Sequence, residues 1–259
     1  MRLGLLLALM SGVSLCARAA DVCNPADLQG AYGFQLNGET TISGSAKPAE
    51  SLGRLVFDGE GGVSGASSVK FAGLLLGNPV TGTYEAHTDC SVTWSLQDDS
   101  GAYQHFSGAA SPDGLRVRFR QTDPGGMRQG LLLRTAAQEC KLTDLQSKYA
   151  FTIEGTFVPM TEAGGQGGAV SKIALKGAME EDSNHHFQLK VEDKTPYSAD
   201  VVISIEPDCG VDMSLALAPP GDGAPASIAL RGILVDKGKQ ILAIQTDPGA
   251  MVSAQFTAP

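Results

Sequence analysis

Residues 23–34 read Cys-Asn-Pro-Ala-Asp-Leu-Gln-Gly-Ala-Tyr-Gly-Phe, and residues 140–151 read Cys-Lys-Leu-Thr-Asp-Leu-Gln-Ser-Lys-Tyr-Ala-Phe. The two stretches share Cys, Asp-Leu-Gln, Tyr and Phe at an offset of 117 residues. Two later blocks repeat in the same way. Block 89–96 matches 208–215 at an offset of 119, and block 121–127 matches 245–251 at an offset of 124. Self-similarity at a long period is the sequence signature of a duplicated structural unit.

The offset between the copies increases only from one matching block to the next, as insertions confined to loops would produce. We therefore expect a tandem duplication, with a first domain at residues 21–134 and a second at residues 135–259. Each copy is long enough to bury a core of its own. Only residues 135–139 connect the two copies, so we also expect the domains to lie in fixed contact.

The first twenty residues have the layout of a secretory signal. Arg2 is followed by an apolar run at residues 3–10 and by Ala-Arg-Ala-Ala at residues 17–20. This order predicts a signal peptide at residues 1–20 and a secreted or periplasmic protein. A lipid anchor at Cys16 is the alternative, although the preceding residue is leucine, where lipoprotein signals usually carry a small residue. No stretch reaches the ~18 apolar residues of a spanning helix, so no integral membrane segment is expected.

Charge and composition exclude several classes of protein. The 259 residues include 28 acidic and 19 basic side chains, for a formal charge of −9. Such an acidic chain disfavours nucleic acid and anionic membranes as partners. Hydrophobic residues make up 42% of the chain and charged residues 18%, which excludes an intrinsically disordered protein.

Local alternation points to β-strands in both copies. Residues 115–120 alternate Leu, Val and Phe with three arginines, and a period of two is typical of a strand with one buried face. Turns that contain Gly and Pro separate such runs at roughly ten-residue spacing. The sequence therefore predicts an all-β protein of two tandem homologous antiparallel β-barrels of about eight strands each. A barrel is favoured over a sandwich because closure leaves no exposed sheet edge.

Three motifs of the first copy carry a family resemblance. They are Leu-Gln-Gly-x-Tyr at residues 28–32, Gly-Thr-Tyr at residues 82–84 before Asp89-Cys90, and Gln-Thr-Asp-Pro-Gly at residues 121–125. This pattern resembles a family of secreted bacterial proteins of unknown function, whose small barrels are akin to lipocalins and to allene oxide cyclase. The second copy departs from it, with Val-Val-Ile at residues 201–203. The resemblance implies a calycin-like barrel fold and no particular activity.

Four cysteines remain after the predicted signal, and they occupy equivalent places in the two copies: Cys23 with Cys140, and Cys90 with Cys209. Four cysteines allow three pairings. Because a single ancestral domain could pair only within itself, we expect the disulfides Cys23–Cys90 and Cys140–Cys209, which suit an exported protein. Metal ligation is the rival explanation. There is no Cys-x-x-Cys spacing and only one histidine lies near a cysteine, so neither a metal site nor a cofactor is expected.

The candidate ligand-binding residues are Trp94 and the arginine stripe, which comprises Arg116, Arg118 and Arg120. If the stripe faces solvent, it is an ordinary wet surface, and Leu242 and Ile244 at the aligned positions of the second copy could be covered by the neighbouring domain. If it faces the lumen, the first barrel holds a cationic pocket for carboxylate or phosphate groups. Burial of three like charges is costly, which favours the solvent-facing alternative.

Two further features have both a structural and a functional interpretation. Trp94 follows a half-cystine, so packing of its ring in the core competes with stacking on a ligand. Asp-Pro-Gly recurs at residues 123–125 and 247–249, where turn formation competes with a pair of functional acids. Asp bonds the turn backbone, Pro fixes φ and Gly accepts positive φ, which favours the turn.

These observations predict a non-catalytic protein that binds a small apolar or amphipathic ligand. No nucleophile elbow, phosphate-binding loop or zinc-protease motif is present, so no catalytic residue is predicted. One alternative is a structural or interaction module with filled barrels. The other is an isomerase or cyclase resembling allene oxide cyclase, which would need a buried acid or histidine in a cavity. The candidates for that role are Glu39, Glu85, Glu154 and His105.

Overall fold

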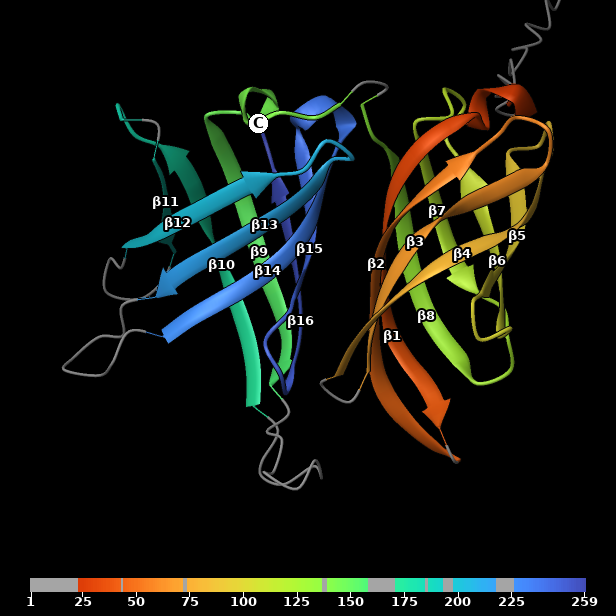
Figure 1. Cartoon of the computed structure of the whole chain (residues 1–259), viewed down its shortest axis with the longest axis horizontal. Coiled ribbons are helices and arrows are strands. Elements are labelled where there is room, and N and C mark those ends of the chain that lie inside the picture. Colours follow the sequence, from red (N-terminus) through yellow and green to blue (C-terminus); the bar gives the residue numbers. More distant parts are fainter. Residues whose placement is uncertain are drawn as a thin grey trace, which may run out of the picture.

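A computed structural model describes residues 23–42, 44–71, 74–136, 139–157, 171–184, 186–192, 198–217 and 226–259. The predicted signal peptide and Cys16 lie outside this part of the chain. The described residues form two closed antiparallel barrels of eight strands each, which lie side by side (Figure 1). The predicted fold class is therefore confirmed.

In the first barrel each strand pairs with the next along the chain, and the last strand pairs with the first. Its strands are β1 (Gly30–Ile42), β2 (Ser45–Phe57), β3 (Gly62–Phe71), β4 (Leu74–Ala86), β5 (Ser91–Asp98), β6 (Tyr103–Ala110), β7 (Arg116–Gln121) and β8 (Gly126–Arg134). The pairing of β1 with β8 leaves no open edge in this sheet.

The second barrel repeats this topology, and β16 pairs with β9 to close it. Its strands are β9 (Lys148–Phe157), β10 (Ser171–Glu181), β11 (Phe187–Val191), β12 (Ser198–Ile205), β13 (Gly210–Leu217), β14 (Ala226–Val235), β15 (Gln240–Gln245) and β16 (Ala250–Thr257). Three short 3-10 helices, η1 (Pro25–Leu28), η2 (Leu142–Asp144) and η3 (Asp236–Gly238), complete the described elements.

The repeated residues of the two copies make the same contacts. Disulfides join Cys23 to Cys90 and Cys140 to Cys209, so both predicted pairings are confirmed. The repeated tyrosine has a structural role as well. The hydroxyl of Tyr32 donates a hydrogen bond to the carbonyl of Gly114, and the hydroxyl of Tyr149 donates to that of Gly238 at 2.6 Å. These contacts tie the first strand of each barrel to a turn at the same end.

Side chains fill the body of each barrel. The core of the first is rich in aromatic residues, namely Tyr32, Phe34, Phe57, Tyr84, Trp94, Phe106 and Phe119. The core of the second is more aliphatic and includes Ile153, Met179, Leu189, Met213, Leu215 and Ile241. These packed interiors resemble those of small barrels that are filled by their own side chains.

The two barrels share a third apolar cluster, which we call the interface. It comprises Leu52, Leu133, Ile233, Val235, Leu242 and Ile244. Gly33 lies in this contact, and a Cβ there would come within 2.6 Å of the Val235 side chain. The amide of Gln35 donates to the carbonyl of Ala243 at 2.8 Å and accepts a hydrogen bond from Gln255 at 2.8 Å. The expected fixed contact between domains is therefore present.

The interface joins different faces of the two copies. The first barrel contributes mainly β1, β2 and β8, whereas the second contributes β14, β15 and β16. By the repeat, β14 and β15 correspond to β6 and β7, and only β16 has its equivalent, β8, in the contact surface of the first barrel. The contact is therefore heterologous, with two non-equivalent surfaces in contact.

An ionisable pair is buried beside the interface. Glu50 and Lys70 lie opposite each other on β2 and β3, and Lys70 donates to the backbone carbonyls of Gln245 and Asp247 in the second barrel. Burial raises the pKa of Glu50 to about 7, although the charge of Lys70 opposes the shift. Burial likewise lowers the pKa of Lys70 to about 8.

We expect Glu50 to make the stability of the protein pH-dependent. Its pKa lies higher in the folded chain than the ordinary value of 4.5, so the native state keeps a proton that the unfolded state loses. The free energy of unfolding should therefore fall as the pH rises from about 4.5 to about 7, by roughly 3 kcal/mol at most. Urea denaturation across this window should show that the fall is much smaller in Glu50→Gln.

Glu154→Gln is the matched control, because this glutamate is exposed on the outer side of the second barrel. An equal pH slope in wild type and Glu50→Gln would show that Glu50 does not titrate in the buried state described above.

Candidate functional site

The arginine stripe lies on the outside of the first barrel. Arg116, Arg118 and Arg120 are all exposed on β7, whereas Val117 and Phe119 between them are buried in the core. The prediction that the stripe faces solvent is therefore confirmed. The alternative, in which the three arginines line a lumenal pocket, is wrong. At the aligned positions, Leu242 and Ile244 are buried in the interface, as the solvent-facing alternative allowed.

Trp94 lies in the core of the first barrel. Its ring stacks on Phe106 with the centroids 5.3 Å apart and lies 4.9 Å from the centroid of Phe119. Other core rings thus occupy the ring face on which a ligand would stack. Of the two interpretations of Trp94, the structure therefore shows packing of its ring in the core. The disulfide Cys23–Cys90 lies directly before β5, the strand that carries Trp94.

Another arginine, Arg128, lies in the lumen of the first barrel. The sequence did not indicate this residue. Arg128 of β8 is 5% exposed. Its guanidinium donates to the Oε1 atoms of Gln121 at 2.8 Å and Gln104 at 3.0 Å, and to the Oγ of Ser51 at 3.0 Å. The three acceptors come from β7, β6 and β2. The side chain therefore braces three strands with neutral partners only.

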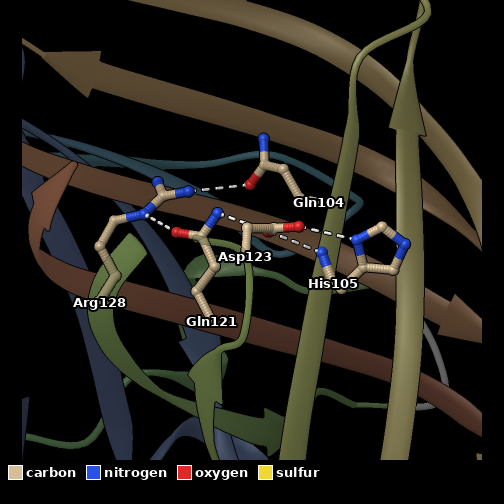
Figure 2. A network of polar contacts seen from close by, with 5 residues as sticks. All are labelled: Gln104, His105, Gln121, Asp123 and Arg128. Carbon is tan, nitrogen blue, oxygen red and sulfur yellow. Dashed lines mark hydrogen bonds and ion pairs between the residues drawn. The ribbon is translucent and has the colours of Figure 1, made fainter. Parts of the chain in front are cut away.

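The contacts of Arg128 continue through the barrel wall (Figure 2). Gln121 donates through Nε2 to Asp123 at 2.8 Å. Asp123 also accepts the backbone N–H of His105 at 2.9 Å, and its other oxygen lies 2.7 Å from Nδ1 of that histidine. Partial burial raises the pKa of Asp123, but the hydrogen bonds from His105 and Gln121 outweigh it and hold the pKa below the usual range.

The guanidinium of Arg128 is charged but incompletely partnered. Burial lowers its pKa, which Asp123 opposes, yet arginine keeps its proton in proteins. A guanidinium carries five N–H donors. Three of them bond described residues, which leaves one N–H on each terminal nitrogen without a partner in the described part of the chain. A carboxylate or phosphate offers the oxygens and the negative charge that these donors lack.

The second barrel has an apolar layer in the same place. The residues equivalent to Ser51, Gln104 and Arg128 are Leu175, Ile228 and Val252, by the repeat offsets and the strand register. Gln245 remains in the place of Gln121, and its Oε1 is buried without a hydrogen-bond partner. We call Arg128 and its acceptors Ser51, Gln104 and Gln121 the polar layer. Among the described residues, only the first barrel has this layer.

The recurrent Asp-Pro-Gly segments are structural in both copies. Asp247 accepts the backbone N–H of Ala229 at 2.9 Å and the amide of Gln245 at 2.8 Å. Asp123 makes the equivalent bonds to His105 and Gln121. Each acid ties the turn to a neighbouring strand, so the turn interpretation is confirmed.

An apolar wall continues from Arg128 on the same face of the sheet. Successive cross-strand partners lead from Arg128 through Gly38 and Ala49 to Phe71 and Leu74. A second row leads from Ser51 through Val69 to Leu76. Directly paired residues point to the same side of a sheet. Leu74 is 51% exposed and Leu76 is 47% exposed, so this end of the barrel presents apolar surface beside the buried charge.

The four residues considered for catalysis do not line an enclosed site. Glu39, Glu85, Glu154 and His105 are all exposed. Across the described ranges, no group of three or more His, Cys, Asp or Glu side chains is arranged to hold a metal ion. None of the helices within those ranges is both long and apolar enough to cross a membrane.

Comparisons with known proteins add little to this description. No known protein family and no curated protein matches the chain. A double mutant of the vaccine antigen transferrin-binding protein B from Haemophilus parasuis is 8% identical, covers 88% of this chain and 74% of its own, and has a TM-score of 0.32. A porin-like protein from Bacteroides uniformis is 10% identical, with coverages of 88% and 97% and a TM-score of 0.21. Similarity this low carries no argument about function, and the barrel architecture rests on the strand pairing described above.

We expect Arg128→Val alone to destabilise the protein. The substitution leaves the acceptors of buried Ser51 and of partly buried Gln104 and Gln121 without their donor, and an unpaired group costs about 1–3 kcal/mol where it is fully buried. The triple variant Ser51→Leu, Gln104→Ile and Arg128→Val copies the layer of the second barrel and should recover most of the loss. The midpoint of urea denaturation measures both effects.

The result would contradict this account of the polar layer if the single variant were as stable as wild type. A triple variant less stable than the single variant would contradict the equivalence of the two lumenal layers.

Proposed function

We propose that this chain is an exported, non-catalytic binding protein whose first barrel takes the anionic group of a small amphipathic ligand at Arg128. One observation carries the proposal. A charged guanidinium is buried in the lumen with three neutral partners, where the second copy has Val252 in an apolar core. A difference of this kind between duplicated domains is what a site specific to one of them would produce.

The chemistry of the buried charge supports an anionic ligand group. A charge removed from water is costly unless it is paired, and the amide and hydroxyl acceptors around Arg128 are uncharged. The unused N–H groups on the two terminal nitrogens match the two oxygens of a carboxylate, which guanidinium groups bind in a bidentate manner. The carboxylate of a ligand would thus supply the missing counter-charge.

The neighbouring wall supports an apolar ligand tail. Val69, Phe71, Leu74 and Leu76 follow the polar layer on the same face, and the two leucines are about half exposed. An apolar tail that covered these side chains would remove their surface from water, which favours binding. The aromatic core fills the barrel beyond Arg128, so the ligand would occupy only this end, with partly exposed Gln104 turning aside to admit it.

The proposal also includes the cellular location, the domain division and the fold family of the protein. The predicted signal at residues 1–20 and the two disulfides suit a secreted or periplasmic protein. The division at residues 134 and 135 gives each copy one barrel, and the meander order of its strands suits a calycin-like domain. The absence of a buried candidate acid or base among Glu39, Glu85, Glu154 and His105 supports a binding role over an isomerase or cyclase.

Calorimetric titration with palmitate and with its methyl ester tests the proposed site. We expect palmitate to bind at least tenfold more tightly than the ester, because only the acid pairs with Arg128. The triple variant Ser51→Leu, Gln104→Ile and Arg128→Val should lose this preference. Leu74→Ser with Leu76→Ser should weaken the binding of both compounds, since the two leucines would contact the tail.

Lys172→Gln with Lys176→Gln is the matched control, because it removes exposed charges from the second barrel and should leave palmitate binding unchanged. Equal affinity for acid and ester, or an unaltered preference in the triple variant, would overturn the role of Arg128. Failure of wild type to bind either compound would overturn the proposal and favour an interaction module with filled barrels, an alternative supported by the packed cores.

A further inference from the structure

We infer that the outer face of β4–β7 in the first barrel binds an acidic polysaccharide. This inference goes beyond the proposed lumenal site and does not depend on it, since the two sites lie on opposite sides of the barrel wall. It rests on three features that occur together. They are the unpaired arginine stripe, a groove lined by hydroxyl groups, and an exposed aromatic pair at the rim of that groove.

The arginine stripe is an uncompensated cationic row on an acidic chain. Arg116, Arg118 and Arg120 are exposed, and their guanidinium groups make no hydrogen bond or ion pair with a described residue. Hydrogen bonds from Ser111 and Leu115 lower the pKa of Asp113, and the nearby charge of Arg116 contributes less. Neither of these hydrogen bonds comes from Arg116. Alternate residues of a strand lie about 7 Å apart. The stripe therefore suits an extended partner that carries a negative charge on successive units.

A groove runs beside the stripe, and hydroxyl-bearing residues line it together with the aromatic residues Tyr84, Trp94 and Phe106. It has a volume of about 360 Å³, and its hydroxyl-bearing residues are Thr83, Thr93, Ser95, Ser107 and Thr122. Glu85 and His105 also line it. Hydroxyl and imidazole groups donate to and accept from other hydroxyls, and a carboxylate accepts from them. A chain of sugar units offers the dense array of hydroxyl groups that such a lining can bind.

The strand register makes the groove and the stripe one surface. Ser107 on β6 lies opposite Arg120 on β7, and Ser95 on β5 lies opposite His105 on β6. At the rim, Tyr103 is 59% exposed, and its ring lies nearly parallel to that of His105, at 18° with centroids 6.4 Å apart. A flat, exposed aromatic pair provides an apolar surface for the face of a sugar ring while its polar atoms remain in water.

The duplication shows that this face can act as a docking surface. In the second barrel, Leu242 and Ile244 stand in the places of Arg118 and Arg120 and are buried in the interface. In the first barrel the corresponding face is exposed and carries Arg118 and Arg120 at these positions. The same position in the fold thus suits an apolar protein surface in one copy and an anionic partner in the other.

The chemistry favours a polysaccharide over other anionic partners. An acidic peptide would satisfy the arginines, but its backbone and carboxylates offer few hydroxyl groups to the groove. An anionic membrane is a broad surface that would also meet the acidic remainder of a chain whose net charge is −9, whereas an extended polymer can follow the stripe alone. A carboxylated polymer of sugars satisfies the stripe and the groove together.

Titration with polygalacturonate, with polyglutamate of equal charge as the comparison, tests the assignment. Polygalacturonate should bind at least tenfold more tightly than polyglutamate. Arg118→Gln with Arg120→Gln should weaken its binding tenfold or more, and Tyr103→Ala should weaken it severalfold. All of these residues are exposed, so the midpoint of urea denaturation should be unchanged and a loss of binding would not reflect unfolding.

The matched control is Lys172→Gln with Lys176→Gln, which removes two charges from one face of β10 in the second barrel. This variant should bind polygalacturonate as wild type does. Unchanged binding in the double arginine variant would overturn the inference. So would equal binding of polyglutamate, or of vesicles containing phosphatidylglycerol, because the partner would then be any polyanion or an anionic membrane.

Discussion

The pairing of the first strand of each copy with its last strand is the constraint on which the rest of the structure depends. Once β1 joins β8, and β9 joins β16, every residue of a strand faces either the lumen or the outside. This choice places Arg128 among buried side chains and Arg118, ten residues earlier in the chain, in solvent. Closure also removes sheet edges, so each barrel can contact other molecules only through its outer side chains and its ends.

The duplication made much of the fold predictable. The repeated cysteines predicted both disulfides, and the alternation in residues 115–120 predicted a strand whose arginines share one side. Arg128 escaped detection because β8 shows no clear alternation. Leu131, Leu132 and Leu133 follow one another, since one side of this strand faces the lumen and the other faces the second barrel. The repeat itself could have revealed Arg128, because it aligns this residue with Val252 of the second copy.

The burial of Glu50 and Lys70 could not be predicted from their own strands. Both lie on the outer side of the sheet, where period-two reasoning places charged residues in water. They are buried because the second barrel packs there, and Lys70 bonds carbonyls about 175 residues away in sequence. Contacts between domains depend on how two folded surfaces fit together, and the local pattern of a strand does not predict that fit. The expectation of a fixed contact followed from the short connector, and the alignment indicated Leu242 and Ile244 as residues that it could cover. The residues of the first barrel that meet them did not follow from the sequence.

The heterologous contact has a consequence for the size of the assembly. Two non-equivalent surfaces that fit each other could in principle stack one barrel after another into an open-ended fibre. The surfaces left free at the two ends of this pair carry charge instead. Arg118 and Arg120 stand where Leu242 and Ile244 dock, and Lys176 stands where Leu52 receives them. Charged residues at both places therefore disfavour the addition of a third barrel through the same contact.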